Sequence, residues 1–233
     1  RTLFFDGQTR YLNAYPLVDR ARRRSLPTPF SWKKNKGSDT PVYDLSVNPE
    51  DPEVECWQPE SLKEPFCDLS KDAVTLLEPR KQVQIHTQRD RVMGRATEDQ
   101  GAVFRYEALA PGQFFGGVIL CPDEETAAVL SALLDCETLF LGGSHSAGYG
   151  RVNIRDVKVA EAWQETPAQS GAIKAGETFT VTLLSDVLLR NANGQFTGFL
   201  TVEILSGLAG VPLVLVPERT HAKTGVIGGF NRK

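Results

Sequence analysis

A glycine-rich segment at residues 141–152 carries residue types that can bind an anion. Its sequence, LGGSHSAGYGRV, contains four glycines within nine residues, with serines, a histidine, a tyrosine and an arginine among them. Glycine permits positive φ angles and the close approach of a second backbone, and successive exposed N–H groups can cradle a phosphate. The segment therefore indicates either a tight turn between two strands or a phosphate-binding loop.

The net charge of −3 hides a strong segregation of charge along the chain. Residues 1–40 hold nine Lys and Arg against three acids, residues 44–78 hold ten acids against two lysines, and residues 80–95 hold five basic residues against one acid. Aromatic residues are interleaved with the first basic stretch, which is typical of a surface that follows a phosphate backbone and stacks bases. The acidic stretch indicates a solvated insertion or a face that meets a basic neighbouring subunit.

Strands and one helix must position these segments. Alternating apolar residues and the Pro111-Gly112 turn signal predict strands before and after that turn, and a proline followed by three acids at 122–125 predicts the start of a helix. The strands expected in this part of the chain are 81–87, 102–108, 114–120, 138–141 and 149–160. After a polar break at 164–176, further strands are expected at 178–189, 196–205 and 211–216. The Asn193-Gly194 pair is a strong hairpin signal between the first two of these.

The order strand–strand–helix–strand predicts an α+β fold of two ferredoxin-like, RRM-type units with antiparallel sheets. The first unit is expected to comprise residues 1–165, with a long irregular insertion of basic and acidic residues at 6–80, where nine prolines fall. The second unit, expected to be incomplete, comprises residues 166–233. The chain starts without methionine and ends inside a glycine-rich motif, so we expect a fragment of a longer protein.

The four cysteines form no Cys-x-x-Cys pair. This spacing predicts reduced thiols in a cytoplasmic protein, without a metal or another cofactor. No run of 18 apolar residues is present, so we expect no membrane contact.

Four segments occur in an order that resembles one protein family. They are HTQRDRVMGRA at 86–96, FRYEALAPGQFF at 104–115, the glycine-rich segment, and GGFNRK at 228–233. Together they resemble the RAMP superfamily, the RNA-binding subunits of type III CRISPR effector complexes. The last segment looks most like the type III-D (Csx-type) member, which binds the 5′ handle of the guide RNA.

The resemblance implies an RNA-binding structural subunit that holds the crRNA by its 5′ handle and nucleates the RAMP backbone in antiviral defence. Its partners would be the crRNA, target RNA by proximity, other RAMP backbone subunits and the large signalling subunit. His145 stands where the family pattern favours a permanently charged Arg or Lys. The residues nominated for RNA contact are Arg22, Arg23, Arg24, Lys33, Lys34, His86, Arg89, Arg91, Arg95, Gly142, Gly143, Ser144, His145, Ser146, Tyr149, Arg151, Asn231 and Arg232.

The resemblance leaves two catalytic alternatives open. Some RAMP relatives cut guide precursors with a histidine as general acid or base, and His86 and His145 are the candidate pair for that chemistry. Others cut target RNA with an aspartate and a metal, for which Asp90 and Asp99 are the candidates. A third possibility is a protein-interaction scaffold without direct RNA contact, which docks through residues 44–78. We favour the non-catalytic holder of the guide RNA.

Overall fold

The chain divides into two compact units, each built from two separate stretches of sequence. The computed structural model describes residues 2–5, 7–18, 23–50, 52–68, 74–88, 94, 102–163, 173–191 and 193–225. Unit 1 comprises residues 1–24 and 79–169, and unit 2 comprises residues 25–78 and 170–233. Every strand pair in the described parts of both units is antiparallel. These observations confirm a mixed α+β, sheet-rich protein.

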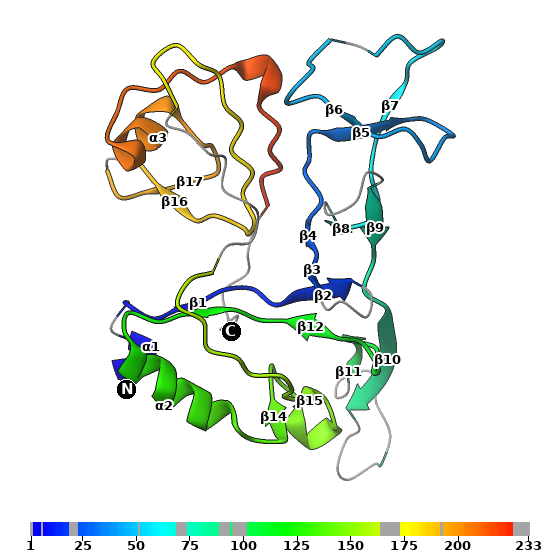
Figure 1. Ribbon diagram of the computed structural model, residues 1–233. Coiled ribbons are helices and arrows are strands. Elements are labelled where there is room, and N and C mark those ends of the chain that lie inside the picture. The colour runs from blue at the N-terminus through cyan, green and yellow to red at the C-terminus, as the bar shows by residue number, and fades with distance from the viewer. Residues whose placement is uncertain are drawn as a thin grey trace. The chain divides into compact units, whose positions relative to one another are not determined.

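Unit 1 contains four small sheets and two α-helices among its described residues (Figure 1). Its strands pair as β1–β13, β12–β2–β3, β10–β11 and β14–β15. The elements are α1 (Thr2–Phe5), β1 (Arg10–Tyr11), β2 (Tyr15–Val18), β3 (Arg23–Arg24), β10 (Lys81–Gln88), β11 (Ala102–Leu109), β12 (Phe115–Gly116), β13 (Ile119–Leu120), α2 (Glu124–Leu134), β14 (Thr138–Phe140) and β15 (Arg151–Asn153).

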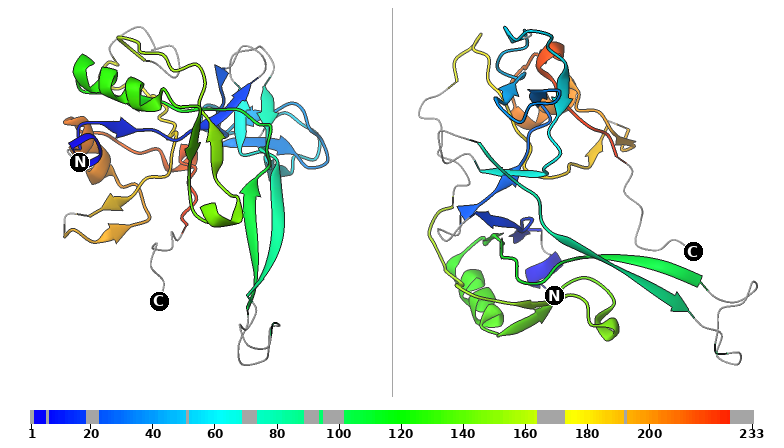
Figure 2. Two further views of the ribbon diagram at one scale, coloured as in Figure 1. Left: turned by 90° about the horizontal axis from the view of Figure 1, so that it is seen from below. Right: turned by 90° about the vertical axis from the view of Figure 1, so that its right-hand side faces the viewer.

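The longest element of unit 1 is the two-stranded ribbon β10–β11. Its register runs over eight residue pairs, from Lys81 opposite Leu109 to Gln88 opposite Ala102, and the ribbon projects from the rest of the unit (Figure 2). On one face Lys81 Nζ pairs with Glu107 Oε1 at 2.8 Å. The hydrogen bond and charge of Lys81 hold the pKa of the Glu107 carboxyl below its usual range. The Glu107 carboxylate is therefore engaged in an ion pair across the ribbon.

Gln113 ties the base of the ribbon to the turn that follows it. Its side-chain oxygen accepts from the Arg80 backbone N–H at 2.7 Å, and its amide group donates to the carbonyls of Arg80 (2.9 Å) and Ala110 (2.7 Å). One side chain thus satisfies three backbone groups where the strand pairing ends.

Replacing Gln113 with alanine should remove all three bonds. At about 0.5–1.5 kcal/mol per hydrogen bond, and with water able to replace part of them, we expect a loss of about 1–2 kcal/mol in unfolding free energy, measured by urea denaturation. Gln113→Glu keeps the acceptor but loses both donated bonds, so it should be destabilised as well. Unchanged stability in both variants would show that the ribbon does not depend on this side chain.

Helix α2 begins and runs as predicted. Asp123 is its N-cap and accepts a hydrogen bond from the Thr126 backbone N–H at 2.7 Å, which lowers the pKa of the Asp123 carboxyl. Glu124 and Glu125 lie in the first turn, and Leu130 is the buried residue of the apolar face.

Unit 2 is built from three small sheets and helix α3 among its described residues. Its strands pair as β4–β8–β9, β6–β5–β7 and β16–β17. Its core consists of Leu26, Trp32 and Cys67, with Val42, Leu62, Leu76 and Leu184 packed against them. The elements are β4 (Leu26–Pro27), β5 (Trp32–Asn35), β6 (Tyr43–Asp44), β7 (Pro59–Ser61), β8 (Phe66–Asp68), β9 (Thr75–Leu77), β16 (Leu189–Arg190), β17 (Phe196–Thr197) and α3 (Val202–Ala209).

The structure differs from the sequence-based expectations in five stretches. The region at 6–80, expected to be mostly irregular, contains the nine short strands β1–β9. Residues 196–205, expected to be one strand, form β17 followed by helix α3, which Thr201 caps by accepting from the Ile204 N–H and Gly210 ends in a left-handed conformation. Residues 154–160, 178–188 and 211–216 are irregular rather than strands. The hairpin at Asn193-Gly194 is confirmed by the β16–β17 pair.

Candidate functional site

Tyr149 joins the glycine-rich segment to the β10–β11 ribbon. Its hydroxyl donates to Gln84 Oε1 at 2.6 Å and lies 2.9 Å from His86 Nε2. Gln84 and His86 are both on β10, and their side chains point to the same face because strand side chains alternate. Two segments more than 60 residues apart in sequence therefore meet through one side chain.

A ring cluster surrounds this polar contact. The Tyr106 ring lies edge-on to His86 at 4.8 Å between centroids, and the Tyr149 ring lies 5.6 Å from Tyr106 and 5.8 Å from His86. Tyr106 is directly opposite Gln84 in the ribbon, so both strands contribute to one face. We call His86, Tyr149, Gln84 and Tyr106 the ribbon–loop cluster.

The direction of the hydrogen bonds fixes the tautomer of His86. A tyrosine hydroxyl has one proton, and that proton is donated to Gln84. Tyr149 can therefore only accept from His86, so Nε2 of His86 carries a proton and donates it. When the ring is neutral, its lone pair is on Nδ1.

His145 has the same tautomer for a different reason. Its Nε2 lies 2.9 Å from the carbonyl oxygen of Gly142, which can only accept, so Nε2 of His145 carries a proton. Its ring also packs against Phe140 at 5.2 Å between centroids. Both histidines thus commit Nε2 to a bond within the protein, which leaves Nδ1 as the basic nitrogen of each neutral ring.

The backbone of the glycine-rich segment is held by bonds that close it across β14 and β15. The Leu141 N–H donates to the Gly150 carbonyl at 2.9 Å, and a 3-10 turn at His145–Ala147 lies between them. Gly142, Gly148 and Gly150 all have positive φ angles, as does Ser144 at 60°. At Gly150 a side chain is excluded, because a Cβ would collide with the Leu141 carbonyl oxygen.

This closed loop offers backbone donors to a ligand. Among the described residues, no hydrogen bond within the protein uses the N–H groups of Gly142, Gly143 and Ser144. They are consecutive, and two of the three residues are left-handed, which is typical of backbone that presents several N–H groups to one anion. Backbone N–H groups of this kind, not bonded within the protein, can bind a phosphate or another small anion.

The nominated basic residues of unit 1 differ in what they contact. Arg151 is exposed at the start of β15, opposite Phe140. Arg23 is exposed on β3, whereas Arg24 beside it donates to the Asn13 carbonyl at 2.8 Å and has its guanidinium 4.8 Å from the Tyr15 ring centroid and 5.6 Å from that of Trp163. Arg24 thus contributes to packing inside the unit.

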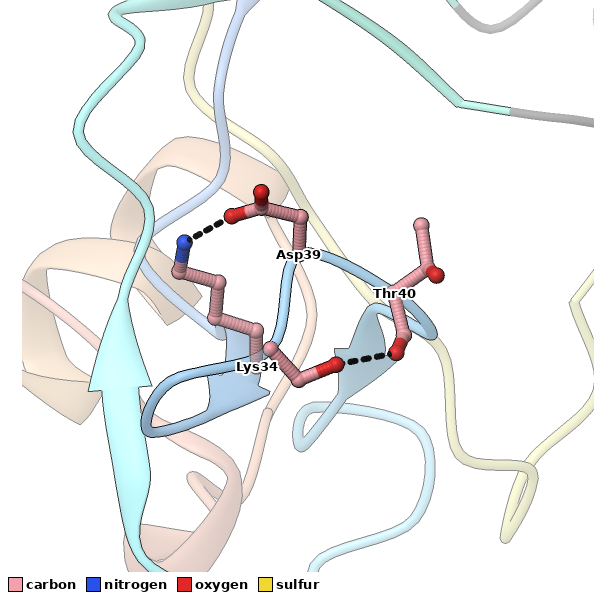
Figure 3. A network of polar contacts seen from close by, with 4 residues as sticks. Lys34, Asp39 and Thr40 are labelled. Atoms are coloured by element: carbon pink, nitrogen blue, oxygen red, sulfur yellow. Dashed lines mark hydrogen bonds and ion pairs between the residues drawn. The ribbon is translucent and has the colours of Figure 1, made fainter.

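Lys33 and Lys34 lie in unit 2, on β5. Lys34 Nζ forms an ion pair with Asp39 Oδ1 at 2.7 Å, and only 14% of its side chain is exposed (Figure 3). The hydrogen bond between them raises the pKa of Lys34 and lowers that of Asp39. Lys33 Nζ donates to Ser61 Oγ at 2.7 Å. Both ammonium groups are therefore engaged with partners inside unit 2.

Unit 2 also contains an acidic cavity. Its volume is about 540 Å³, and it is lined by Tyr43, Asp44, Val47, Asn48, Pro49, Glu50, Pro52, Glu53 and Arg219. Burial alone would raise the pKa of Asp44, but hydrogen bonds from Ser46, Ser31 and Trp32 lower it, so this residue is a stable carboxylate. Three acids against one arginine make this cavity a poor place for RNA phosphates.

Eight nominated residues lie outside the described part of the chain. They are Arg22, Arg89, Asp90, Arg91, Arg95, Asp99, Asn231 and Arg232. For Ser146 the structure describes the backbone turn but not the side chain.

Two features that bear on cofactors and membranes were searched in the described residues. There, no group of three or more His, Cys, Asp or Glu side chains could hold a metal ion. Within the same residues, none of the helices has the length and apolar character needed to cross a membrane.

Sequence reasoning missed Gln84 and did not nominate Tyr106 for the site. Alternation places Gln84 and His86 on one face of β10, and Tyr106 and Phe104 on one face of β11. It does not tell which face of β10 lies on the same side of the ribbon as which face of β11. The register, with Gln84 opposite Tyr106, supplies that information. No sequence signal links either residue to Tyr149.

In the described residues the fold is an antiparallel α+β arrangement, and the ribbon β10–β11 meets the glycine-rich segment through the ribbon–loop cluster. Residues 12–153, more than half of the chain, match the family model of the RAMP superfamily. The chain belongs to the RAMP superfamily. The match includes the ribbon and the glycine-rich segment, and it indicates a CRISPR-associated RNA-binding subunit of the kind that assembles with RNA and other subunits. The search of curated proteins found no match to the chain.

Proposed function

We propose that this protein is a structural subunit of a type III CRISPR ribonucleoprotein, most similar to the type III-D (Csx-type) member, and that it holds the 5′ handle of the crRNA. The observation that carries the proposal is the ribbon–loop cluster. It joins strand β10 to the glycine-rich segment, in which the N–H groups of residues 142–144 are not bonded within the described protein, and the sequence after β10 carries three arginines at 89–95. A single strand needs such backbone donors and cations to be held in register.

The partners follow from the same proposal. The crRNA is the primary ligand, target RNA lies close to it, and neighbouring RAMP backbone subunits and the large signalling subunit complete the complex. We propose that the subunit nucleates the RAMP backbone in the cytoplasm.

We further propose that residues 1–165 form a first RRM-type unit with an insertion at 6–80, and that residues 166–233 belong to a second. The order β10, β11, β12, β13, α2, β14 supports the first of these, since antiparallel strands precede and follow one helix, as in part of a ferredoxin-like unit.

The proposal is tested by the salt dependence of RNA binding. Changing Arg89, Arg91 and Arg95 together to glutamine should weaken binding of a labelled single-stranded RNA and reduce the slope of log K against log salt by about 2, since each lost phosphate contact on a single strand contributes about 0.7. Filter binding over a range of salt concentrations measures both quantities.

The matched control removes three positive charges elsewhere, from residues that the structure describes. Arg155, Lys158 and Lys174 are exposed and were not nominated for RNA contact. Their triple glutamine variant should keep the parent slope within error. If the two triple variants have equal slopes of log K against log salt, Arg89, Arg91 and Arg95 do not contribute specifically to guide binding.

A second candidate function is a protein-interaction module, which the acidic cavity of unit 2 favours. A basic segment of a neighbouring subunit would complement Asp44, Glu50 and Glu53. The two candidates separate in the experiment above, because a scaffold without RNA contact shows no salt-dependent RNA binding in any variant. The double variant Asp90→Ala, Asp99→Ala in the assembled complex distinguishes an endoribonuclease from a non-catalytic RNA-binding subunit. We expect the complex with this variant to cleave target RNA at every site that the parent complex cleaves.

A further inference from the structure

In the β16–β17 hairpin of unit 2 (Figure 1), an arginine is stacked on an exposed aromatic ring. Arg190 and Phe196 are directly opposite each other in the antiparallel pair. The guanidinium carbon of Arg190 lies 4.1 Å from the centroid of the Phe196 ring. The hairpin lies outside residues 12–153, the part of the chain that matches the RAMP family model.

The hairpin turn holds this pair in place. Arg190 donates from Nη1 to the Gly194 carbonyl at 2.8 Å, which fixes the guanidinium over the ring. Asn191 Oδ1 accepts from the N–H groups of Asn193 and Gln195, each at 3.0 Å, and Gly194 has φ of 77°. A preordered turn means that little side-chain entropy is lost when a ligand binds.

The pair is open to solvent, and the hairpin sequence that carries it contains no acid. Phe196 is 69% exposed, and Leu188, the residue before β16, is 72% exposed. Residues 187–202 contain no Asp or Glu, so the positive charge of Arg190 is not neutralised by a neighbour in sequence. The bond to Gly194 occupies one of the five N–H groups of the guanidinium, which can therefore also donate to a phosphate.

The same strand is joined to the start of the basic C-terminal region. Thr224 Oγ1 donates to the Gly198 carbonyl at 3.2 Å, and a Cβ at Gly198 would come within 2.6 Å of Thr224 Cγ2. Glycine at this position lets the segment with Lys223 pack directly after β17. A second cation is thereby held near the hairpin.

We propose that Arg190 and Phe196, here called the hairpin platform, bind one base of a single-stranded RNA. The base stacks on the guanidinium–ring pair, and the guanidinium donates to an adjacent phosphate. A flat cationic group over an aromatic ring fits a nucleobase with its phosphate, since every base presents a π-face. The proposal rests on the RNA-binding function proposed above and extends it to a part of the chain beyond the family match.

The test uses the full chain and a fluorescein-labelled 20-nucleotide oligouridine. Phe196→Leu keeps an apolar side chain but removes the ring, so RNA affinity should fall about tenfold, within the range of stacking contributions. Arg190→Lys keeps the charge but loses the planar stack, so affinity should fall about fivefold with an unchanged salt slope. Phe199→Leu is the matched control, because Phe199 is 73% exposed, and its affinity should change less than twofold.

Photocrosslinking of the unmodified chain makes the test independent of how the variants fold. Oligouridine containing 4-thiouridine should crosslink within residues 190–196, as mapped by mass spectrometry of peptides. If the chain binds RNA with the arginine-dependent salt slope but without this crosslink, or if Phe196→Leu behaves like Phe199→Leu, the platform is overturned while the proposed function stands. If Phe196→Leu weakens only the binding of another protein subunit, the platform is likewise overturned. Absence of any RNA binding by the parent chain would overturn both.

Discussion

Gly150→Ala is expected to destabilise the glycine-rich segment more than any other single alanine substitution in it. Gly150 has φ of 78°, where an L-residue costs about 1–2 kcal/mol. The new Cβ would also collide with the Leu141 carbonyl oxygen, so the Leu141–Gly150 hydrogen bond at 2.9 Å must lengthen or break. We expect a total loss of about 3 kcal/mol in unfolding free energy, measured by denaturant titration.

Two neighbouring glycines separate the causes of this loss. Gly148 also has a positive φ, 84°, but a Cβ there meets no atom within 4 Å, so Gly148→Ala should lose only the backbone contribution of about 1–2 kcal/mol. At Gly143 a Cβ likewise meets no atom within 4 Å, and φ is not positive, so Gly143→Ala should change stability by less than about 0.5 kcal/mol. Equal losses at all three positions would contradict the contact with Leu141.

RNA binding should follow the same order. Tyr149 precedes Gly150, so a displaced Gly150 moves the side chain that connects the loop to the ribbon. Gly150→Ala should therefore weaken RNA affinity about tenfold or more, while Gly143→Ala, which also keeps its N–H group, should stay close to the parent.

Local signals predicted the elements around the site. Glycine density predicted a closed loop between two strands, which β14 and β15 confirm, and Pro122 with three acids predicted α2. The short strands at 10–77 escaped prediction because elements of two to four residues are too short to show a period of two. Helix α3 was not predicted because its β-branched and apolar residues are typical of a strand, although Thr201 and Gly210 are ordinary helix-cap residues.

Contacts between distant segments are the part that sequence patterns could not supply. Tyr149 and Gln84 are 65 residues apart, and neither residue type nor spacing indicates that they meet. The nominated basic stretch at 1–40 is also divided, since Arg23 and Arg24 belong to unit 1 while Lys33 and Lys34 belong to unit 2. Charge counts along the chain describe composition, whereas the partners of Arg24 and Lys34 depend on packing.

The second large effect is expected from Tyr149→Ala, which removes the hydrogen bonds and ring contacts that join the loop to the described part of the ribbon. The change loses hydrogen bonds to Gln84 and His86 and ring contacts with His86 and Tyr106. At about 1 kcal/mol per neutral hydrogen bond and about 0.5–1.5 kcal/mol per aromatic contact, and since the cluster is partly solvated, we expect a loss of about 2–3 kcal/mol in unfolding free energy.

Tyr149→Phe isolates the hydroxyl within this loss. It keeps the ring but leaves His86 Nε2–H and Gln84 Oε1 without their shared partner, so about 1 kcal/mol should be lost. A double-mutant cycle of Tyr149→Phe with Gln84→Ala should then show a coupling energy of about 0.5–1 kcal/mol. The same cycle with Gln82→Ala, two residues earlier on the same face of β10, should show coupling below about 0.3 kcal/mol.

RNA affinity decides whether this connection matters for the proposed function. Tyr149→Ala leaves the N–H groups of 142–144 and all nominated arginines in the chain. If each RNA contact contributed to affinity independently, this variant would lose only the contribution of Tyr149. If the ribbon and the loop must be held together to grip one strand, affinity should instead fall about tenfold or more. Measured coupling to Gln84 combined with parent-like RNA affinity in Tyr149→Ala would mean that the cluster stabilises unit 1 without organising an RNA site.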